Sequence, residues 1–254
     1  MVSIKSEREI QLMREAGRIL AAVLEELEKA LKPGMSTMDV DKLGEHLIRN
    51  HGCIPSFKNY NGYPGSICVS VNDEVVHGIP NKHHYLKEGD IVSLDAGVIY
   101  KGYHSDAART CPVGQISPEA QKLIAVTRES FFQGIKFAKA GNHLNDISSA
   151  IQTYAEGFGY GVVRDLVGHG IGSHLHEDPE VPNFAQKRRG ILLRPGMTLA
   201  IEPMINAGHY DVAWMDDGWT VVTRDGSLSA HYENTILITE GEPEILSLGK
   251  TSEE

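Results

Sequence analysis

Cysteine is scarce in this sequence, acidic residues outnumber basic ones, and no long apolar run occurs. The three cysteines, none of them in a Cys-x-x-Cys pair, exclude a disulfide framework and indicate a reducing compartment, for which we expect the cytoplasm. No apolar run approaches the ~20 residues of a membrane span, and the N-terminal residues are too polar for a signal peptide. The net charge of −10 argues against direct DNA binding and against an anionic membrane surface.

Acidic side chains and histidines are what the sequence has in plenty. It contains 34 acidic residues and 12 histidines in 254 residues. The apolar share of 41% is that of a globular protein, and the length suits one large domain or two small ones. The combination of acid and histidine is the feature that a functional interpretation has to explain.

Capping signals and helical spacing of apolar residues predict four helices. The first follows a capping box formed by Ser6 and Glu9 and stops at Pro33-Gly34. The second covers roughly residues 37–51, the third runs from Ser117 to near Gly141, and the fourth begins at about residue 144. Strands are expected over residues 67–71, 90–99, 103–113, 198–205, 219–223 and 233–239.

The two halves of the chain repeat the same pattern with an offset of 107 residues. Gly34 and Gly141 each separate two helices, and the string Leu86-Lys87-x-Gly89 recurs as Leu193-Arg194-x-Gly196. In each half a carboxylate lies six residues after the glycine of this string: Asp95 after Gly89, and Glu202 after Gly196. Several matches in one register indicate a duplication rather than chance.

The duplication predicts an α+β fold with pseudo-twofold symmetry in a single domain, residues 1–254. The repeats cover roughly residues 6–113 and 117–240, and two helix pairs pack on one face of a curved, mainly antiparallel sheet. His104-Ser105-Asp106 and His231-Tyr232-Glu233 are the next equivalent pair. Their offset of 127 residues places about 20 extra residues in a hairpin of the second half. The acids are expected to converge near the pseudo-twofold axis.

Asp95 and Asp106 lie on two apolar strands that a Lys101-Gly102 turn can join. This register places both acids on one face of the sheet as diagonal neighbours. Two like charges on a buried face are costly unless a cation lies between them. The alternative is that a register slip turns one acid to solvent, or that Arg109 pairs with it.

Two further acids, Glu202 and Glu233, also lie in apolar strands. Four carboxylates are more than one ion needs, so we predict two divalent metal ions, with His169 between glycines as the nitrogen ligand. A site rich in oxygen with one imidazole suits Co, Mn or Fe, and Zn is possible. His104 and His231, each two residues before an acid, are expected to orient the ligands.

Six strings carry a resemblance to the pita-bread metallopeptidases, and within them to the type I methionine aminopeptidases. The resemblance extends from Ile4 to about Leu248. The strings are Asn61-Gly62-Tyr63-Pro64, Val75-Val76-His77-Gly78-Ile79-Pro80, Gly168-His169-Gly170-Ile171-Gly172, Arg194-Pro195-Gly196-Met197-Thr198, Ile201-Glu202-Pro203-Met204 and Asp217-Gly218-Trp219-Thr220.

The resemblance implies an enzyme that removes the N-terminal methionine from nascent proteins and peptides when the second residue is small. A water between two metals would attack the scissile carbonyl, and Glu202 would transfer its proton. His77 and His176 would hydrogen-bond the scissile amide and the tetrahedral intermediate. The implied metal ligands are Asp95, Asp106, His169, Glu202 and Glu233.

A methionine pocket is implied as well, and its walls are expected to be soft or aromatic. The positions that match the family's pocket are Tyr60, Tyr63, Cys68 and Trp219. Phe57 lies near the rim, where ordinary core packing explains it better. Family members often carry an aromatic residue directly before the second histidine, and Leu175 departs from this pattern. The basic loop Gln186–Arg189 is a surface loop that could contact the ribosome.

Two alternative functions remain open at this stage. An Xaa-Pro aminopeptidase or dipeptidase shares the five ligands but usually carries an additional N-terminal domain. A non-catalytic pita-bread binding protein would have lost ligands, whereas all five are present here. We expect a monomer that acts on polypeptide N-termini.

Overall fold

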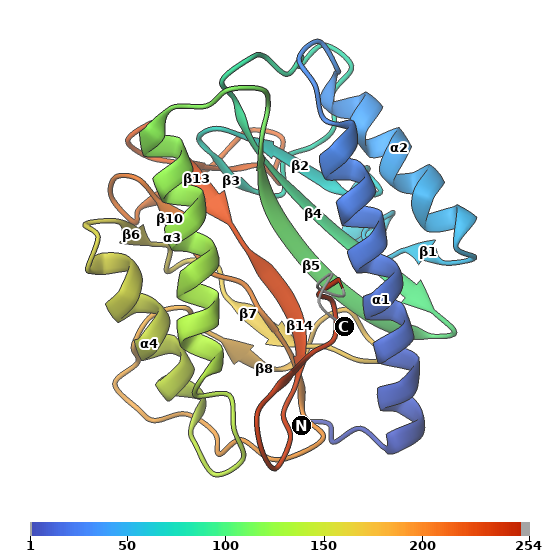
Figure 1. Ribbon diagram of the computed structural model, residues 1–254, viewed down its shortest axis with the longest axis vertical. Coiled ribbons are helices and arrows are strands. Elements are labelled where there is room, and N and C mark those ends of the chain that lie inside the picture. The colour runs from blue at the N-terminus through green and yellow to red at the C-terminus, as the bar shows by residue number, and fades with distance from the viewer. Residues whose placement is uncertain (1, 250–254) are drawn as a thin grey trace.

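A computed structural model describes residues 2–249, so the two ends of the expected domain range lie outside the described residues (Figure 1). The helices of this part of the chain are α1 (Glu7–Ala30), α2 (Thr37–Asn50), α3 (Pro118–Ile135) and α4 (Leu144–Glu156), with a short 3-10 helix η1 (Tyr60–Gly62). Between residues 2 and 249 no helix is long and apolar enough to cross a membrane.

A nine-stranded sheet forms the centre of the molecule. Its main path is β1 (Ile54–Pro55), β4 (Ile91–Tyr100), β5 (Tyr103–Pro112), β14 (Glu233–Leu237), β9 (Thr198–Ile201), β7 (Gly168–Gly170) and β8 (Glu177–Val181). Off this path, β2 (Cys68–Val71) pairs with β4, and β15 (Glu244–Ile245) pairs with β14. All of its strand pairs are antiparallel, as the sequence predicts.

Two small sheets accompany the main one. The first contains β13 (Ser229–His231), β10 (Met204–Asn206) and β6 (Gly161–Val162) in that order. The second contains β11 (Val212–Trp214), β12 (Val221–Thr223) and β3 (Glu74–Val76). Strands β11 and β12 lie between β10 and β13 in the chain, which is where the sequence predicts the extra residues of the second half.

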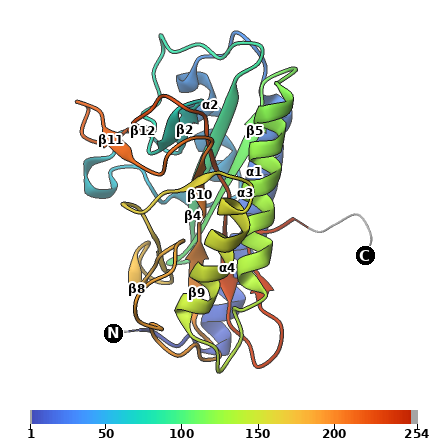
Figure 2. The ribbon, with the colours of Figure 1, turned by 90° about the vertical axis from the view of Figure 1, so that its left-hand side faces the viewer.

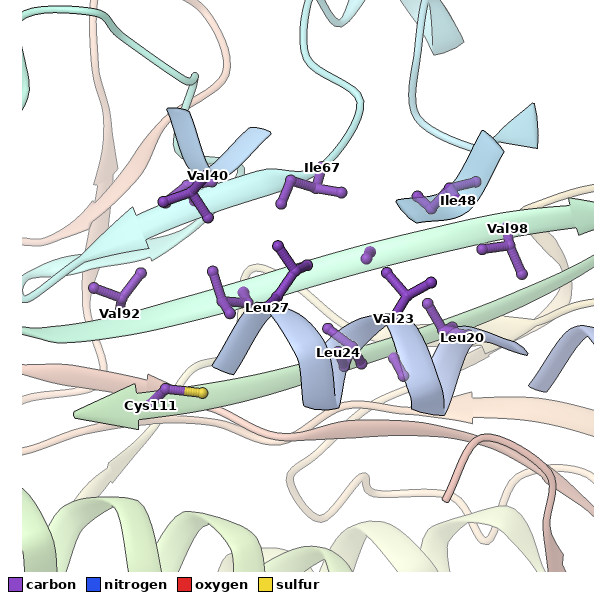
Figure 3. Close-up of a cluster of buried hydrophobic side chains, with 14 of the residues drawn as sticks. Leu20, Val23, Leu24, Leu27, Val40, Ile48, Ile67, Val92, Val98 and Cys111 are labelled. Atoms are coloured by element: carbon purple, nitrogen blue, oxygen red, sulfur yellow. The ribbon is translucent and has the colours of Figure 1, made fainter. Parts of the chain in front are cut away.

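The helices cover one face of the sheet. Figure 2 shows α1 and α3 on one side of the strands, whereas β8, β11 and β12 lie on the other side. Leu20, Val23, Leu24 and Leu27 of α1 pack on the sheet together with Val92 and Val98 of β4 (Figure 3). This apolar layer leaves the opposite face of the central strands for polar chemistry.

Most predicted elements are present with small shifts at their ends, but one helix and one strand differ more. The third helix was expected to reach residue 140 and ends at Ile135, because tight turns replace helical hydrogen bonds there: Ala138 N donates to Ile135 O at 2.9 Å and Lys139 N to Phe137 O at 2.8 Å. The strand expected over residues 198–205 breaks after Ile201. Pro203 has no N–H for a ladder, and the chain turns there from the main sheet into β10.

The β4–β5 hairpin has the predicted register. Asp95 is opposite Ala108, and Asp106 is opposite Gly97. Lys101 and Gly102 form the turn with positive φ angles of 48° and 88°, as a type I′ hairpin turn requires. Both acids therefore lie on one face of the sheet.

Equivalent backbone contacts recur in the two halves at the offset of 107 residues. Gly34 N donates to Leu86 O at 2.8 Å, and Gly141 N donates to Leu193 O at 3.1 Å. Both glycines have a φ of +89°. The isolated bridges 36–85 and 143–192 are separated by the same offset. These contacts support the predicted duplication.

Candidate metal centre

Four carboxylates meet at the centre of the main sheet. Asp95 lies on β4 and Asp106 on β5. Glu202 directly follows β9, and Glu233 begins β14. Because these strands are neighbours in the order β4-β5-β14-β9, their acids converge. Three of the four residues are buried, and the Glu202 side chain keeps only 14% of its surface exposed.

Burial raises the pKa of all four carboxyl groups above their ordinary values. The charges of neighbouring carboxylates raise the pKa of Asp106, Glu202 and Glu233 further. Arg109 does not neutralise the acids by direct pairing. Its guanidinium donates to Ala108 O at 2.7 Å and to Asn234 Oδ1 at 2.6 Å instead. The alternative of an Arg109 salt bridge is therefore wrong.

Several carboxylate oxygens in this cluster lack a hydrogen-bond partner. Asp95 Oδ1, Asp106 Oδ1 and Glu233 Oε1 are buried and unpaired, which is costly for polar atoms. The ligand atoms form two groups, and the atoms within each group lie within 4.8 Å of one another. Asp106, His169 and Glu233 form one group, and Asp95, His231 and Glu233 form the other. Divalent cations would satisfy these oxygens and offset the repulsion, so the residues fit a metal centre.

His169 on β7 turns one ring nitrogen into this cluster. Its Nδ1 lies 2.8 Å from Gly170 O, so Nδ1 carries the proton and Nε2 is free to bind a metal. Nε2 lies 3.8 Å from Asp106 Oδ2 and 3.7 Å from Glu202 Oε1. Burial, and to a smaller extent the nearby His176, lowers the pKa of His169 to about 3. The imidazole is therefore neutral, as a ligand must be.

A cavity of about 330 Å³ opens on the carboxylates. His77 and His176 line it. The rings of His169 and His176 meet edge to face with centroids 4.2 Å apart, and Tyr60 Oη lies 2.7 Å from His176 Nδ1. Burial lowers the pKa of His77 to about 4 and also lowers that of His176. Both histidines are therefore neutral hydrogen-bonding groups near pH 7.

The apolar wall of the cavity contains all four predicted pocket residues, which are Tyr60, Tyr63, Cys68 and Trp219. The rings of Tyr63 and Trp219 pack edge to face at 5.2 Å, and the Tyr63 hydroxyl donates to Gly78 O at 2.9 Å. Phe57 is buried in the core, as expected, and also lines the cavity. Leu175 is buried in the same wall.

Some cavity residues were not predicted from the sequence. Leu166, Val167 and Met204 also line the wall. Each lies two or three residues from a predicted ligand, and this proximity is the signal that could have found them. Of the two histidines expected to orient ligands, His104 hydrogen-bonds Ser56 Oγ at 3.0 Å, whereas His231 faces the carboxylates directly.

Comparison with known proteins identifies the family of this site. A model of metallopeptidase family M24 matches residues 11–240. The chain belongs to this family. A methionine aminopeptidase of Clostridium acetobutylicum is 58% identical over 248 residues, which cover 98% of this chain and 99% of that protein. The M24 membership and this relative confirm the resemblance that the sequence motifs indicate.

Solved structures of the M24 family agree with the fold. The crystal structure of a methionine aminopeptidase from Thermotoga maritima matches with a TM-score of 0.95 and 48% identity, covering 98% of this chain and all of that one. A prolidase from Pyrococcus furiosus, at 22% identity, shares only the fold, with a TM-score of 0.78, and this chain covers 66% of it. The predicted pita-bread fold is confirmed, and the Xaa-Pro alternative is not favoured.

Proposed function

We propose that this M24 metallopeptidase is a methionine aminopeptidase, which removes the N-terminal methionine from nascent polypeptides and peptides whose second residue is small. The observation that carries the proposal is the apolar cavity of about 330 Å³ that ends on four carboxylates. The similarity to a methionine aminopeptidase over nearly the whole of both chains supports it.

The metal ligands in this proposal are Asp95, Asp106, His169, Glu202 and Glu233. The unpaired buried oxygens and the two ligand groups that share Glu233 support a pair of divalent ions. Co, Mn, Fe and Zn all suit carboxylates combined with imidazole. When bound, such a pair supplies a water of lowered pKa and positive charge for the developing oxyanion.

Glu202 is the proton carrier in this proposal. It is the carboxylate that follows a strand rather than lying within one, and its side chain is the most exposed of the four. It therefore reaches the cavity as well as the ligand cluster. We assign to it the removal of a proton from the attacking water and the delivery of that proton to the leaving amine.

His77 and His176 bind the scissile amide and its tetrahedral intermediate. If the Tyr60 hydroxyl donates to His176 Nδ1, as the 2.7 Å contact allows, the His176 proton resides on Nε2 and can be donated to the substrate. The methionine side chain occupies the apolar wall. Tyr63, Cys68 and Trp219 provide polarizable contacts to a flexible thioether there.

Substrates of this kind arise where proteins are made, so we place the enzyme in the cytoplasm. The basic loop at residues 186–189 is exposed in a protein of net charge −10, and we propose it as a transient contact with the ribosome. Co-sedimentation with ribosomes at low salt tests this contact. Replacing Lys187, Arg188 and Arg189 with glutamate should abolish co-sedimentation, and binding unaffected by these changes would exclude it.

The activity is tested by incubating metal-loaded protein with Met-Ala-Ser and with an Xaa-Pro peptide. We expect free methionine from the first peptide and no cleavage of the second. Activity should depend on a divalent metal, and a chelator should remove it. Cleavage of the Xaa-Pro peptide with Met-Ala-Ser left intact would overturn the proposal.

A further inference from the structure

His231 is a second imidazole that faces the metal centre. It ends β13, two residues before Glu233, and is 1% exposed. Neither of its ring nitrogens has a hydrogen-bond partner. A buried histidine with both nitrogens unsatisfied is unusual, because buried polar atoms are nearly always paired. The ring nitrogens therefore lack a partner, which a ligand bound in this cluster would supply.

The position of His231 relative to the carboxylates repeats that of His169. His231 Nε2 lies 3.9 Å from Glu202 Oε2 and 3.8 Å from Glu233 Oε2. His169 Nε2 lies at 3.8 and 3.7 Å from its two carboxylate oxygens. These gaps are too long for hydrogen bonds. They leave room for a cation about 2.0–2.2 Å from each donor atom.

Each histidine belongs to its own group of ligand atoms. His169 lies with Asp106 and Glu233, and His231 lies with Asp95 and Glu233, with every ligand atom of a group within 4.8 Å of the others. Only Glu233 belongs to both groups. The two imidazoles therefore stand on the two sides of a shared carboxylate, as ligands of two neighbouring ions would.

We propose that His231 is a direct ligand of the metal ion on the Asp95 side, so that each ion of the pair has one imidazole. The proposal rests on the dimetal site of the proposed function and adds a sixth protein ligand to it. Imidazole ligation favours Fe, Co and Zn over Mn and Mg. The second ion should therefore be less tolerant of Mn than a site built of carboxylates alone.

Cobalt-loaded protein tests the proposal without reference to activity. A histidine bound to Co(II) gives a strongly shifted N–H proton signal that disappears in D₂O. The full chain loaded with two equivalents of Co(II) should show two such signals, and His231→Gln should show one. Titration calorimetry of His231→Gln should show one of the two Co(II) affinities reduced by about 100-fold. Loss of a residue that only hydrogen-bonds a metal ligand costs up to about 100-fold, and loss of a direct ligand should cost at least as much.

A control is His46→Gln, because His46 is exposed on α2 and hydrogen-bonds Asn50 rather than a group of the carboxylate cluster. It should retain both signals and both affinities. One shifted signal in the doubly loaded wild-type protein, binding of a single Co(II), or two signals in His231→Gln would each overturn the proposal. The wild-type spectrum decides the matter even if the variant fails to fold.

Release of methionine from Met-Ala-Ser is measured separately, so the two proposals can fail independently. Free methionine together with a single imidazole signal would refute the His231 ligand and leave the proposed activity intact. Two imidazole signals without peptide cleavage would refute the activity and leave the ligand assignment intact.

Discussion

The hydroxyl oxygen of Tyr60 lies 2.7 Å from Nδ1 of His176, with the two rings 5.2 Å apart. The contact joins the short helix η1 to the cavity wall across 116 residues of sequence. A hydroxyl that donates to Nδ1 fixes the tautomer of the imidazole. In that tautomer Nε2–H is available to a substrate.

Replacing Tyr60 with phenylalanine should lower the turnover number about fivefold, because one hydrogen bond that orients His176 contributes about 1 kcal/mol. The apolar ring remains, so the Michaelis constant should change little. Steady-state kinetics on Met-Ala-Ser check this expectation. An unchanged turnover number would show that the contact does not orient the catalytic ring.

Replacing Glu202 with glutamine should lower turnover by about 10²–10⁴-fold, since the amide cannot accept the proton of the attacking water. Thermal unfolding of metal-free Glu202→Gln should show no loss of stability, because one of four repelling carboxylates is removed. Glu26→Gln, a change at an exposed position of α1, is the control for both measurements. Near-normal turnover in Glu202→Gln would remove the role assigned to Glu202.

Metal removal should destabilise the protein as well as inactivate it. The four carboxylates repel one another when no cation lies between them, and a ligand present at 100 times its dissociation constant stabilises by about 2.7 kcal/mol. For a domain of this size, addition of Co(II) to chelator-treated protein should therefore raise the melting temperature by about 5–10 °C. Scanning calorimetry measures the shift, and identical curves with and without Co(II) would contradict a metal centre built from these acids.

Glu74, which lies away from the metal cluster on β3, makes folding stability depend on pH. Burial, together with the smaller effect of the charges of Asp73 and Asp217, raises the pKa of its carboxyl to about 7. The folded state therefore binds this proton more tightly than the unfolded state. Stability is full below about pH 4.5 and declines as the pH rises to about 7.

Replacing Glu74 with glutamine should remove that decline, because the amide oxygen can still accept from Val71 N and carries no charge. At pH 8 the metal-free variant should exceed the wild type in unfolding free energy by about 3 kcal/mol, and at pH 4 the two should be similar. Urea unfolding across this range, with Glu26→Gln again as control, measures the difference. If the difference in unfolding free energy between variant and wild type is the same at pH 4 and pH 8, Glu74 is not the source of the pH dependence.

The duplicated glycines should respond alike to substitution. Gly34 and Gly141 share a φ of +89°, and a methyl group at either position would meet open space. Alanine should therefore cost about 1–2 kcal/mol at each through backbone strain alone. Gly241→Ala, also in open space but without a positive φ, should cost little. Clearly unequal costs at positions 34 and 141, measured by urea unfolding, would weaken the case for a repeat.

Local signals explain why much of the fold could be predicted from the sequence. The capping box at Ser6 and the turn at Lys101-Gly102 each act over a few residues. The start of α1 follows from the first, and the register of the β4–β5 hairpin follows from the second. The convergence of the four acids required one further premise, the internal repeat.

Long-range pairing explains what could not be predicted. His231 faces the carboxylates because β13 pairs with β10, where His231 is opposite Met204. No local pattern specifies that pairing. The break at Pro203 is similar, since a proline can end a strand or lie at its edge, and only the second sheet decides which.

The strand order has a consequence for the enzyme's own synthesis. Two of the clustered carboxylates, Asp95 and Asp106, come from the first half of the chain, and Glu233 on β14 lies between β5 and β9 in the sheet. A chain still being made, and shorter than 233 residues, therefore lacks the carboxylate common to both ligand groups. If Glu233 is the shared metal ligand that we propose, the enzyme acquires its activity only when β14 is complete, and an unfinished copy cannot process other unfinished chains.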